Sequence, residues 1–205
     1  MIQTAEILVV DDNSTNRLKL RMAVRALGHK ADVAENGAVA LGALRERRYD
    51  AVLLDIVMPE VDGYDVLQAM KGDEELRDIP VIVISSLDNE TESVVKAIKL
   101  GAEDFLPKDF ESAILKARLD ASLARKRFRD RELEYFRDVE QLTRAAQVIE
   151  AGAFRPAELD IDRVAARRDP IGQLATVFLA LAREIYDRER RHDQTVRTLR
   201  GTLLV

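Results

Sequence analysis

Several apolar runs in the first half of this chain end on a polar or charged side chain, and this pattern constrains the fold most. Short runs rich in leucine and β-branched residues are typical of strands buried on both faces of a parallel sheet. The carboxyl ends of such strands form one edge, so residues far apart in the chain meet there. Three carboxylates, a hydroxyl and an ammonium at one edge suit a cation together with a phosphoryl group. These polar residues are Asp11, Asp12, Asp55, Ser85 and Lys108.

Apolar runs alternate with helical patterns from residue 5 to about residue 108. Gly28 and Gly101 follow two of the helical patterns, where a glycine commonly ends a helix. The alternation predicts an α/β fold, a doubly wound five-stranded parallel sheet of the flavodoxin-like type. The predicted strands are 5–10, 31–34, 51–54, 80–85 and 103–106, and the predicted helices are 14–27, 36–47, 63–71 and 90–100.

The chain after Lys108 has a different pattern. No Pro or Gly occurs before Gly152, which predicts one helix of about 42 residues beginning near Asp109. Its apolar positions are spaced by three and four residues, as in a coiled coil, but the stretch 124–132 is charged. A connector is predicted at 151–169. A second long helix follows, with its apolar stripe at Ile171, Leu174, Phe178, Leu181 and Ile185.

Neither long helix can bury its apolar stripe alone. Two arrangements satisfy this requirement: a homodimer that pairs the helices of two copies, and an antiparallel hairpin within one copy.

Composition narrows the classes of function. The first 120 residues carry 15 basic and 23 acidic side chains, which argues against direct nucleic-acid binding there. The chain has no cysteine, so thiol chemistry is excluded. No apolar stretch approaches the roughly 20 residues of a membrane helix, and the start lacks a secretion signal. The sequence therefore predicts a soluble cytoplasmic protein. His29 and His192 are both expected to be solvated.

A set of motifs in the first 120 residues, about three-fifths of the chain, resembles the receiver domain of bacterial two-component response regulators. A lone pair of aspartates would carry little information, but all the motifs in this order are specific. We expect this domain to span residues 1–122. The motifs are Asp11-Asp12, Asp55-x-x-Met58-Pro59-x-x-Asp62-Gly63, Ser85-Ser86 and Gly101-Ala-x-Asp-Phe-Leu-x-Lys108.

The resemblance implies a phosphoacceptor site. Asp55 would accept a phosphoryl group from a histidine kinase or a phosphotransfer protein, and Lys108 would pair with a phosphate oxygen. Ser85 and Phe105 would act as the switch residues. A Mg²⁺ ion would be held directly by Asp12 and Asp55, the carbonyl of Val57 would contribute, and Asp11 would act mainly through bound water. Such a protein is a signalling protein and not an enzyme that turns over a substrate.

Two features depart from the family pattern. The family usually has a proline in cis after the lysine, whereas Asp109 stands there in this chain. A cis bond to a non-proline residue costs about 2.5–4 kcal/mol, so we predict a trans Lys108–Asp109 bond. Val57 and Leu87, which flank the site, are both apolar and cannot orient a water molecule. We therefore predict a long-lived phosphoaspartate.

Residues 123–205 resemble a HAMP signalling unit, in which two helices and a connector form a parallel four-helix bundle on dimerisation. The resemblance rests on 148–154 and on 168–178, although the connector is longer than usual. We expect phosphorylation of Asp55 to be passed through the fifth helix to such a bundle. Other possibilities are the regulatory front of a longer enzyme such as a nucleotide cyclase, a nucleic-acid-binding regulator, and a Mg²⁺-dependent phosphatase or phosphotransferase.

Overall fold

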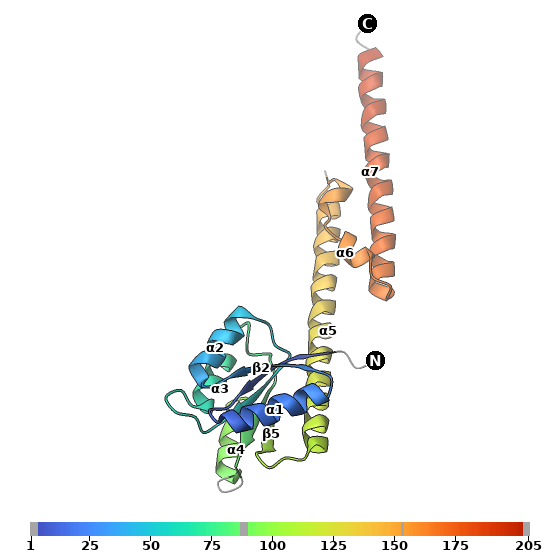
Figure 1. Ribbon diagram of the computed structural model, residues 1–205. Helices are drawn as coiled ribbons and strands as arrows, with labels where there is room; N and C mark the ends of the chain where they lie inside the picture. The colour runs from blue at the N-terminus through green and yellow to red at the C-terminus, as the bar shows by residue number, and fades with distance from the viewer. Residues whose placement is uncertain (1–3, 87–89, 153, 203–205) are drawn as a thin grey trace. The chain divides into compact units, whose positions relative to one another are not determined.

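The computed structural model describes residues 4–86, 90–152 and 154–202. Its first part is a five-stranded sheet in which all neighbouring strands are parallel, in the order β2-β1-β3-β4-β5 (Figure 1). The predicted doubly wound α/β fold is therefore confirmed, with strand ends shifted by a residue at most. The strands are β1 (Glu6–Val10), β2 (Lys30–Ala34), β3 (Ala51–Asp55), β4 (Val81–Ser85) and β5 (Asp104–Pro107).

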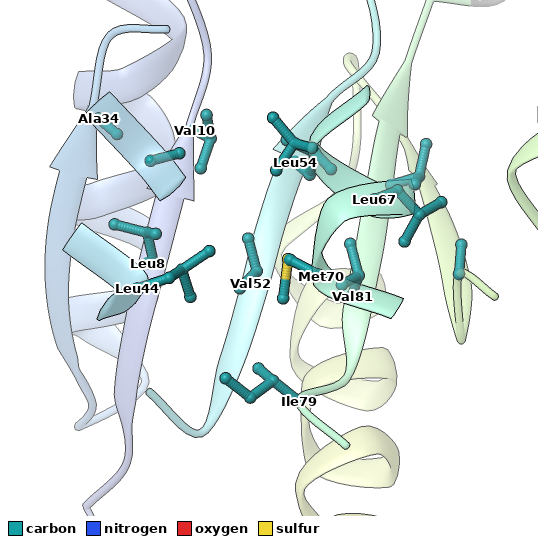
Figure 2. Close-up of a cluster of buried hydrophobic side chains, with 14 of the residues drawn as sticks. Leu8, Val10, Ala34, Leu44, Val52, Leu54, Leu67, Met70, Ile79 and Val81 are labelled. Atoms are coloured by element: carbon teal, nitrogen blue, oxygen red, sulfur yellow. The ribbon is translucent and has the colours of Figure 1, made fainter. Parts of the chain in front are cut away.

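Helices cover both faces of the sheet because alternate strand residues point to opposite sides. From β1, Leu8 and Val10 join one apolar cluster, which is drawn in Figure 2. This cluster is covered by α2 (Gly37–Glu46), α3 (Gly63–Gly72) and α4 (Glu90–Lys99). Ile7 and Val9 join the other cluster. The second cluster is covered by α1 (Ser14–Ala26) and by the first part of α5 (Ser112–Glu150).

Local sequence fixes where α1 and α3 begin, close to the strand ends. The Asn13 side chain caps α1 by accepting hydrogen bonds from the backbone N–H groups of Thr15 and Asn16. Asp62 caps α3 in a reciprocal pair with Asp65. Gly63 is required for a close approach, since a Cβ there would lie 2.2 Å from the carbonyl oxygen of Asp55. The start of α3 therefore packs directly against the end of β3.

The helix α5 is continuous over 39 residues and contributes to two compact units, Met1–Arg129 and Asp130–Val205. Within the first unit its charged stretch is held by Glu103, which precedes β5. Glu103 accepts hydrogen bonds from Arg125 at 2.8 Å and from Arg129 at 3.5 Å. Arg129 also donates to the carbonyl oxygen of Asp78 at 2.9 Å. Two of the charges that interrupt the predicted coiled-coil pattern thus have partners in the first unit.

In the second unit, α5 and α7 (Pro170–Thr202) run in the same direction. The chain between them forms a 3-10 turn, η2 (Pro156–Glu158), and a short helix, α6 (Asp162–Ala165). Arg167, just before α7, bonds to Asp138 on α5 at 2.6 Å. Phe154, just after α5, contacts Tyr186 on α7, with ring centroids 6.3 Å apart. The start of α7 therefore lies beside Asp138 and its middle lies beside the end of α5, an order that parallel helices give and the antiparallel hairpin left open by the sequence does not.

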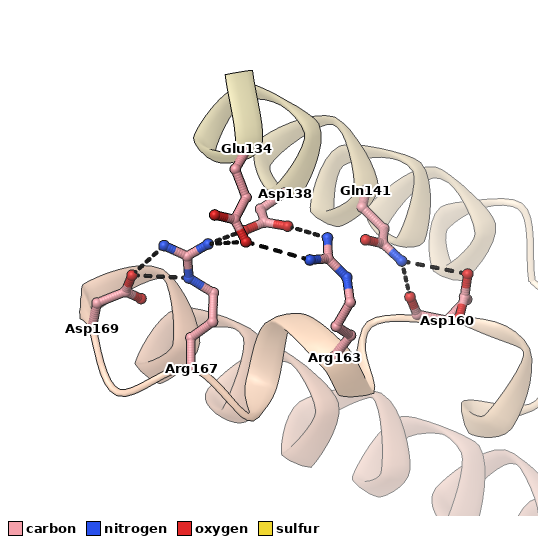
Figure 3. Close-up of polar contacts among 7 residues, drawn as sticks. All are labelled: Glu134, Asp138, Gln141, Asp160, Arg163, Arg167 and Asp169. Carbon is pink, nitrogen blue, oxygen red and sulfur yellow. Dashed lines mark hydrogen bonds and ion pairs between the residues drawn. The ribbon is translucent and has the colours of Figure 1, made fainter. Parts of the chain in front are cut away.

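A polar network joins α5 to the connector in this unit (Figure 3). The Asp138 carboxylate is fully buried and accepts from Arg163 at 2.5 Å and from Arg167 at 2.6 Å. Arg167 also pairs with Asp169 at 2.6 Å, and this pairing raises the pKa of Arg167 and lowers that of Asp169. Asp169 in turn caps α7 by accepting from the N–H of Gly172 at 3.0 Å. One network thus links α5, the connector and the first turn of α7.

The residues buried in the second unit are only partly the predicted stripe. On α7 the inward positions include Ala175, Leu179 and Ala182, whereas Leu174 and Leu181 are 57% and 53% exposed. Residues of the connector share this cluster with both helices, and larger side chains of α7 remain outside it. None of the described helices combines the length and the apolar character that a bilayer crossing requires.

His29 contradicts the sequence prediction, because it is buried and not solvated. Its Nδ1 accepts a hydrogen bond from the backbone N–H of Ala5 at 3.2 Å, so the imidazole joins the end of α1 to the start of β1. Burial lowers the pKa of this histidine. His192 lies on α7 and is exposed, as expected.

Candidate functional site

Three aspartates gather at the carboxyl edge of the sheet. Asp11 and Asp12 directly follow β1, and Asp55 is the last residue of β3. The strand order reverses direction at β1 and β3, which is where ligands bind in open parallel sheets. One carboxylate oxygen from each of the three lies within 4.8 Å of the others. The structure therefore brings the predicted acidic residues together.

Asp11 is buried, and only one of its two carboxylate oxygens has a partner. Oδ1 accepts from the backbone N–H of Asn13 at 2.8 Å and from the Asn16 amide at 3.4 Å. Oδ2 is buried without a hydrogen-bond partner among the described residues. Burial raises the pKa of Asp11, against the lowering effect of its hydrogen bonds and of Lys108. A carboxylate oxygen in this state is a ready cation ligand.

Asp55 is fully buried and is paired with the predicted lysine. Lys108, which follows β5, places its Nζ 2.7 Å from Oδ2 of Asp55. The backbone N–H of Val57 donates to Oδ1 at 3.3 Å. Burial raises the pKa of Asp55, Lys108 opposes that rise and the neighbouring Asp11 adds to it. The lysine thus holds a carboxylate that the surrounding protein would otherwise favour in its protonated form.

The other predicted site residues lie around this pair. Ser85 ends β4 and is buried, and its hydroxyl makes one long hydrogen bond of 3.4 Å to the carbonyl of Ser86. Phe105 is only partly buried, with the guanidinium of Arg118 5.0 Å from its ring centroid. The Val57 side chain is 71% exposed, and Leu87 lies outside the described residues.

The peptide bond between Lys108 and Asp109 is trans, as predicted. The loop that contains it is tied to the sheet, since the backbone N–H of Lys108 donates to the carbonyl of Ser85 at 2.9 Å. A main-chain hydrogen bond therefore joins the lysine and the serine of the site.

Two cations on α1 were not among the candidate residues. Arg17 donates from one nitrogen to the carbonyl oxygens of Asp11 and Asp12, at 2.7 and 2.8 Å. Lys19 donates to the carbonyl oxygen of Lys108 at 2.9 Å and lies 4.4 Å from the ring centroid of Phe110. Sequence alone gives little signal for them, because a basic residue on an amphipathic helix is usually solvated.

The donor set fits a hard divalent cation. Three carboxylates converge, one of them offers a buried oxygen with no other partner, and Mg²⁺ prefers oxygen ligands. Without a cation the three carboxylates repel one another, so a bound cation removes a cost that the fold otherwise carries.

A family model described as the response regulator receiver domain matches residues 7–120, more than half of the chain. The chain belongs to this receiver family. Such receiver domains act in two-component phosphorelays, in which they interact with histidine kinases or phosphotransfer proteins.

Individual relatives agree with this assignment. Response regulator MprA of Mycobacterium sp. (strain KMS) is 37% identical over 119 residues, which cover 58% of this chain and 50% of MprA. Protein PilH of Pseudomonas aeruginosa is 37% identical over 120 residues, covering 58% of this chain and 98% of PilH. The chain thus spans about half the length of MprA and nearly all of PilH.

Solved structures give the same result for the fold. The receiver domain of sensor histidine kinase PA1611 from Pseudomonas aeruginosa is 28% identical, with a TM-score of 0.55. The match covers 60% of this chain and 99% of that domain, which has a magnesium ion coordinated in its active-site cleft.

Proposed function

We propose that Asp55 is the phosphoacceptor of this receiver. The observation that carries the proposal is the buried Asp55 carboxylate, paired with Lys108 at 2.7 Å beside two further aspartates. The phosphoryl donor is a phosphohistidine of a histidine kinase or of a phosphotransfer protein.

The proposed reaction is a phosphoryl transfer from nitrogen to oxygen. A carboxylate oxygen of Asp55 forms the bond to phosphorus, and the phosphorus–nitrogen bond breaks with its electron pair leaving on the imidazole. Lys108 moves its pairing from the carboxylate to a phosphoryl oxygen. When bound by Asp11, Asp12, Asp55 and the Val57 carbonyl, Mg²⁺ supplies neutralisation of the phosphoryl charge.

Formation of the phosphoaspartate supplies the energy of the switch. Moving a population from 1:99 to 99:1 takes about 5.5 kcal/mol. Hydrogen bonds to charged groups contribute about 1.5–3 kcal/mol each, so the Ser85 hydroxyl and Lys108 with one or two backbone amides are together sufficient. Among the described residues, the Ser85 hydroxyl gives up one long hydrogen bond of 3.4 Å, and Phe105 would turn inward as the serine moves.

The proposal is tested with acetyl phosphate and Mg²⁺ on the full chain, followed by intact mass. We expect one phosphoryl adduct on the wild-type chain and none on Asp55→Asn. Equal labelling of the two proteins would overturn the assignment of Asp55. The adduct should persist for hours, since Val57 offers no group to orient a water. Decay within seconds would contradict that part of the proposal.

We further propose that α5 carries the change into a HAMP-like dimeric bundle formed by residues 123–205. The support comes from the second unit. At about 100° per residue, the exposed Phe136, Val139 and Ala146 lie about 70–150° to one side of the inward face of α5. The exposed Leu174, Leu181 and Ile185 lie about 100° to the opposite side of the inward face of α7.

The two exposed stripes are displaced in opposite directions from the inward faces of α5 and α7. When two parallel helices face each other, such stripes lie on the same side of the helix pair. A second copy related by a two-fold axis presents the same surface, so two pairs cover one another in a four-helix bundle. This is the arrangement that the exposed stripes favour.

Light scattering with Mg²⁺, before and after adding beryllofluoride as a phosphate mimic, tests the dimer. Leu181→Glu should dissociate it, whereas Ala180→Glu should not, because Ala180 is also exposed but lies at least about 100° around α7 from each residue of the stripe. On α5 the matched pair is Phe136→Glu and Val148→Glu. A monomeric wild-type chain under both conditions would overturn the dimer and leave the phosphoacceptor proposal standing.

A further inference from the structure

We infer that α1 positions both halves of the phosphoryl site: Arg17 holds the acidic pair, and Lys19 holds Lys108. The inference rests on the proposed function of the site and assigns roles to two residues outside its reacting groups. Neither cation reaches a carboxylate of the site in a hydrogen bond. Both instead donate to main-chain carbonyl oxygens of the residues that do the chemistry.

Arg17 acts on the acidic half. Its guanidinium is largely buried, with 17% of the side chain exposed, and it bridges the consecutive carbonyls of Asp11 and Asp12. Fixing two successive peptide planes fixes the directions in which the two side chains leave the backbone. Those side chains must converge with Asp55 to hold one cation. Arg17 is therefore a positioning residue for the cation ligands.

Lys19 acts on the other half through the loop between β5 and α5. Among the described residues, the Nζ of Lys19 donates to the carbonyl oxygen of Lys108 and lies over the ring of Phe110. Phe110 is buried under α1, so the loop is held at the carbonyl of Lys108 and at the aromatic ring. The Nζ of Lys108 reaches Asp55 from this fixed base. Lys19 is therefore a positioning residue for the lysine that pairs with phosphate.

For Arg17, a role through charge and a role through positioning predict opposite changes in Mg²⁺ affinity, so one measurement distinguishes them. If Arg17 acted only through its positive charge, Arg17→Met would remove repulsion and tighten Mg²⁺ binding. If it positions the ligands, the same change weakens Mg²⁺ binding, by about tenfold as for other groups that orient metal ligands. Arg17→Lys keeps the charge but not the rigid planar donor, so it should also bind Mg²⁺ more weakly than the wild type.

For Lys19 we expect an effect on beryllofluoride binding and not on Mg²⁺ binding. Lys19→Met should leave the Mg²⁺ affinity within twofold of the wild type while weakening beryllofluoride binding by about threefold, the scale of one net hydrogen bond. Because salt screens exposed charges, a charge effect would vanish in concentrated salt, whereas a positioning effect persists. Lys19→Arg should restore binding.

The experiment is calorimetric titration of the full chain with Mg²⁺, then with beryllofluoride in excess Mg²⁺. Arg25→Met, at an exposed position on the same helix, is the control for loss of a charge, and thermal melts verify folding. Tighter or unchanged Mg²⁺ binding by Arg17→Met, or a Lys19→Met effect abolished by salt, would overturn the inference. Failure of the wild-type chain to bind beryllofluoride would instead refute the phosphoacceptor proposal, and the Mg²⁺ titration would still decide the role of Arg17.

Discussion

Asp11 carries a free-energy cost that the fold tolerates in order to bind a cation. Its buried Oδ2 has no partner among the described residues, and burial raises the pKa of the carboxyl group. Leaving a buried polar group unpaired costs about 1–3 kcal/mol. Without a cation, this carboxylate therefore lowers the stability of the fold, which is a common property of functional sites.

Asp11→Asn should therefore stabilise the chain at neutral pH in the absence of divalent ions, by about 1–3 kcal/mol. A raised folded-state pKa means that the protonated form stabilises the fold, and this contribution is lost as the pH rises through that pKa. The variant mimics the protonated form, so its advantage should shrink as the pH falls toward the ordinary carboxyl range. Thermal melts in chelator across this pH range measure the difference.

The same melts with added Mg²⁺ provide the control. The wild-type chain should gain stability with Mg²⁺ concentration, because the ion binds the native state, and the variant should gain much less. An Asp11→Asn protein that is destabilised in chelator would show that the unpaired oxygen carries no cost.

His29 gives the opposite pH dependence. Burial lowers its pKa, and a proton on Nδ1 would remove the hydrogen bond from Ala5. The unfolded chain then binds the proton more readily, so stability falls as the pH drops below the ordinary histidine value of about 6.5. The charges that face it are Asp50, Lys116, Asp120 and Arg127.

Urea unfolding at pH 7.5 and 5.5 should show this loss for the wild-type chain and a flatter profile for His29→Gln. Equal pH dependence in the two proteins would mean that another group titrates.

How far sequence predicted these residues depends on the range of the contacts involved. Asp11, Asp55 and Lys108 were placed together correctly because the ends of parallel strands share an edge. The prediction for His29 was wrong because the glycine before it indicates a turn but gives no sign of Ala5, 24 positions earlier, whose N–H donates to the imidazole. Arg17 and Lys19 were missed for a similar reason, since their partners are main-chain carbonyls without a sequence signature.

At the scale of elements, α5 and its connector are held by charge as well as by apolar contact. The buried Asp138 accepts from two arginines, whereas Glu134, one turn earlier, is about half exposed and contacts the same arginines at 3.4 and 3.6 Å. Removing one partner of a buried ion pair costs more than removing an exposed one.

Asp138→Asn should therefore destabilise the second unit by about 1.5–3 kcal/mol, the scale of hydrogen bonds to a charged group, because its partner arginines are 27% and 60% exposed. Glu134→Gln, its matched control, should cost at most about 1 kcal/mol. Hydrogen exchange of amides in α7 reads out the loss, and equal exchange in both variants would contradict the role given to the buried carboxylate.

Gly172 sets the packing between the connector and α7. A Cβ there would lie 2.1 Å from the carbonyl oxygen of Arg167, and nothing flexible can move aside. Gly172→Ala should destabilise the second unit by about 1–3 kcal/mol or more. Gly42→Ala is the matched control, since it has open space within 4 Å and should stabilise α2 by up to about 1 kcal/mol.

Limited proteolysis measures both glycine variants. Cleavage within 151–169 should speed up only in Gly172→Ala, and unchanged cleavage would show that the close approach is not maintained in solution.

The heptad pattern predicted long helices, but it did not predict which of their positions meet within the chain. It weighs alanine little, yet Ala145, Ala175 and Ala182 are buried in the apolar cluster of the second unit, which residues of the connector share. The larger residues of the stripe are left for another surface. A one-dimensional pattern identifies apolar positions and leaves open which neighbour covers each.

At the scale of the whole molecule, α5 is the only continuous element shared by both compact units in the described chain. The proposed signal from Asp55 to α7 has this helix as its continuous route. Inserting Gly-Ser between Arg129 and Asp130 should interrupt helical continuity where the two units join. We expect beryllofluoride binding to remain within twofold of the wild type.

The readout is the change that beryllofluoride causes in hydrogen exchange of α7, which should disappear in the insertion variant. An insertion of seven residues with the helical sequence repeated is the control, because it restores the rotational phase after about two turns. A response that survives the Gly-Ser insertion would refute transmission through α5.

The parallel course of α5 and α7 has a consequence for how such a chain is assembled. A helix enters the second unit at one end, and a helix with the same polarity leaves at the other. A segment of this kind can be inserted into a longer helical rod, or repeated in tandem, without reversing the direction of the rod. Gene fusion can therefore add or remove such a segment between an input domain and the next part of a helical protein.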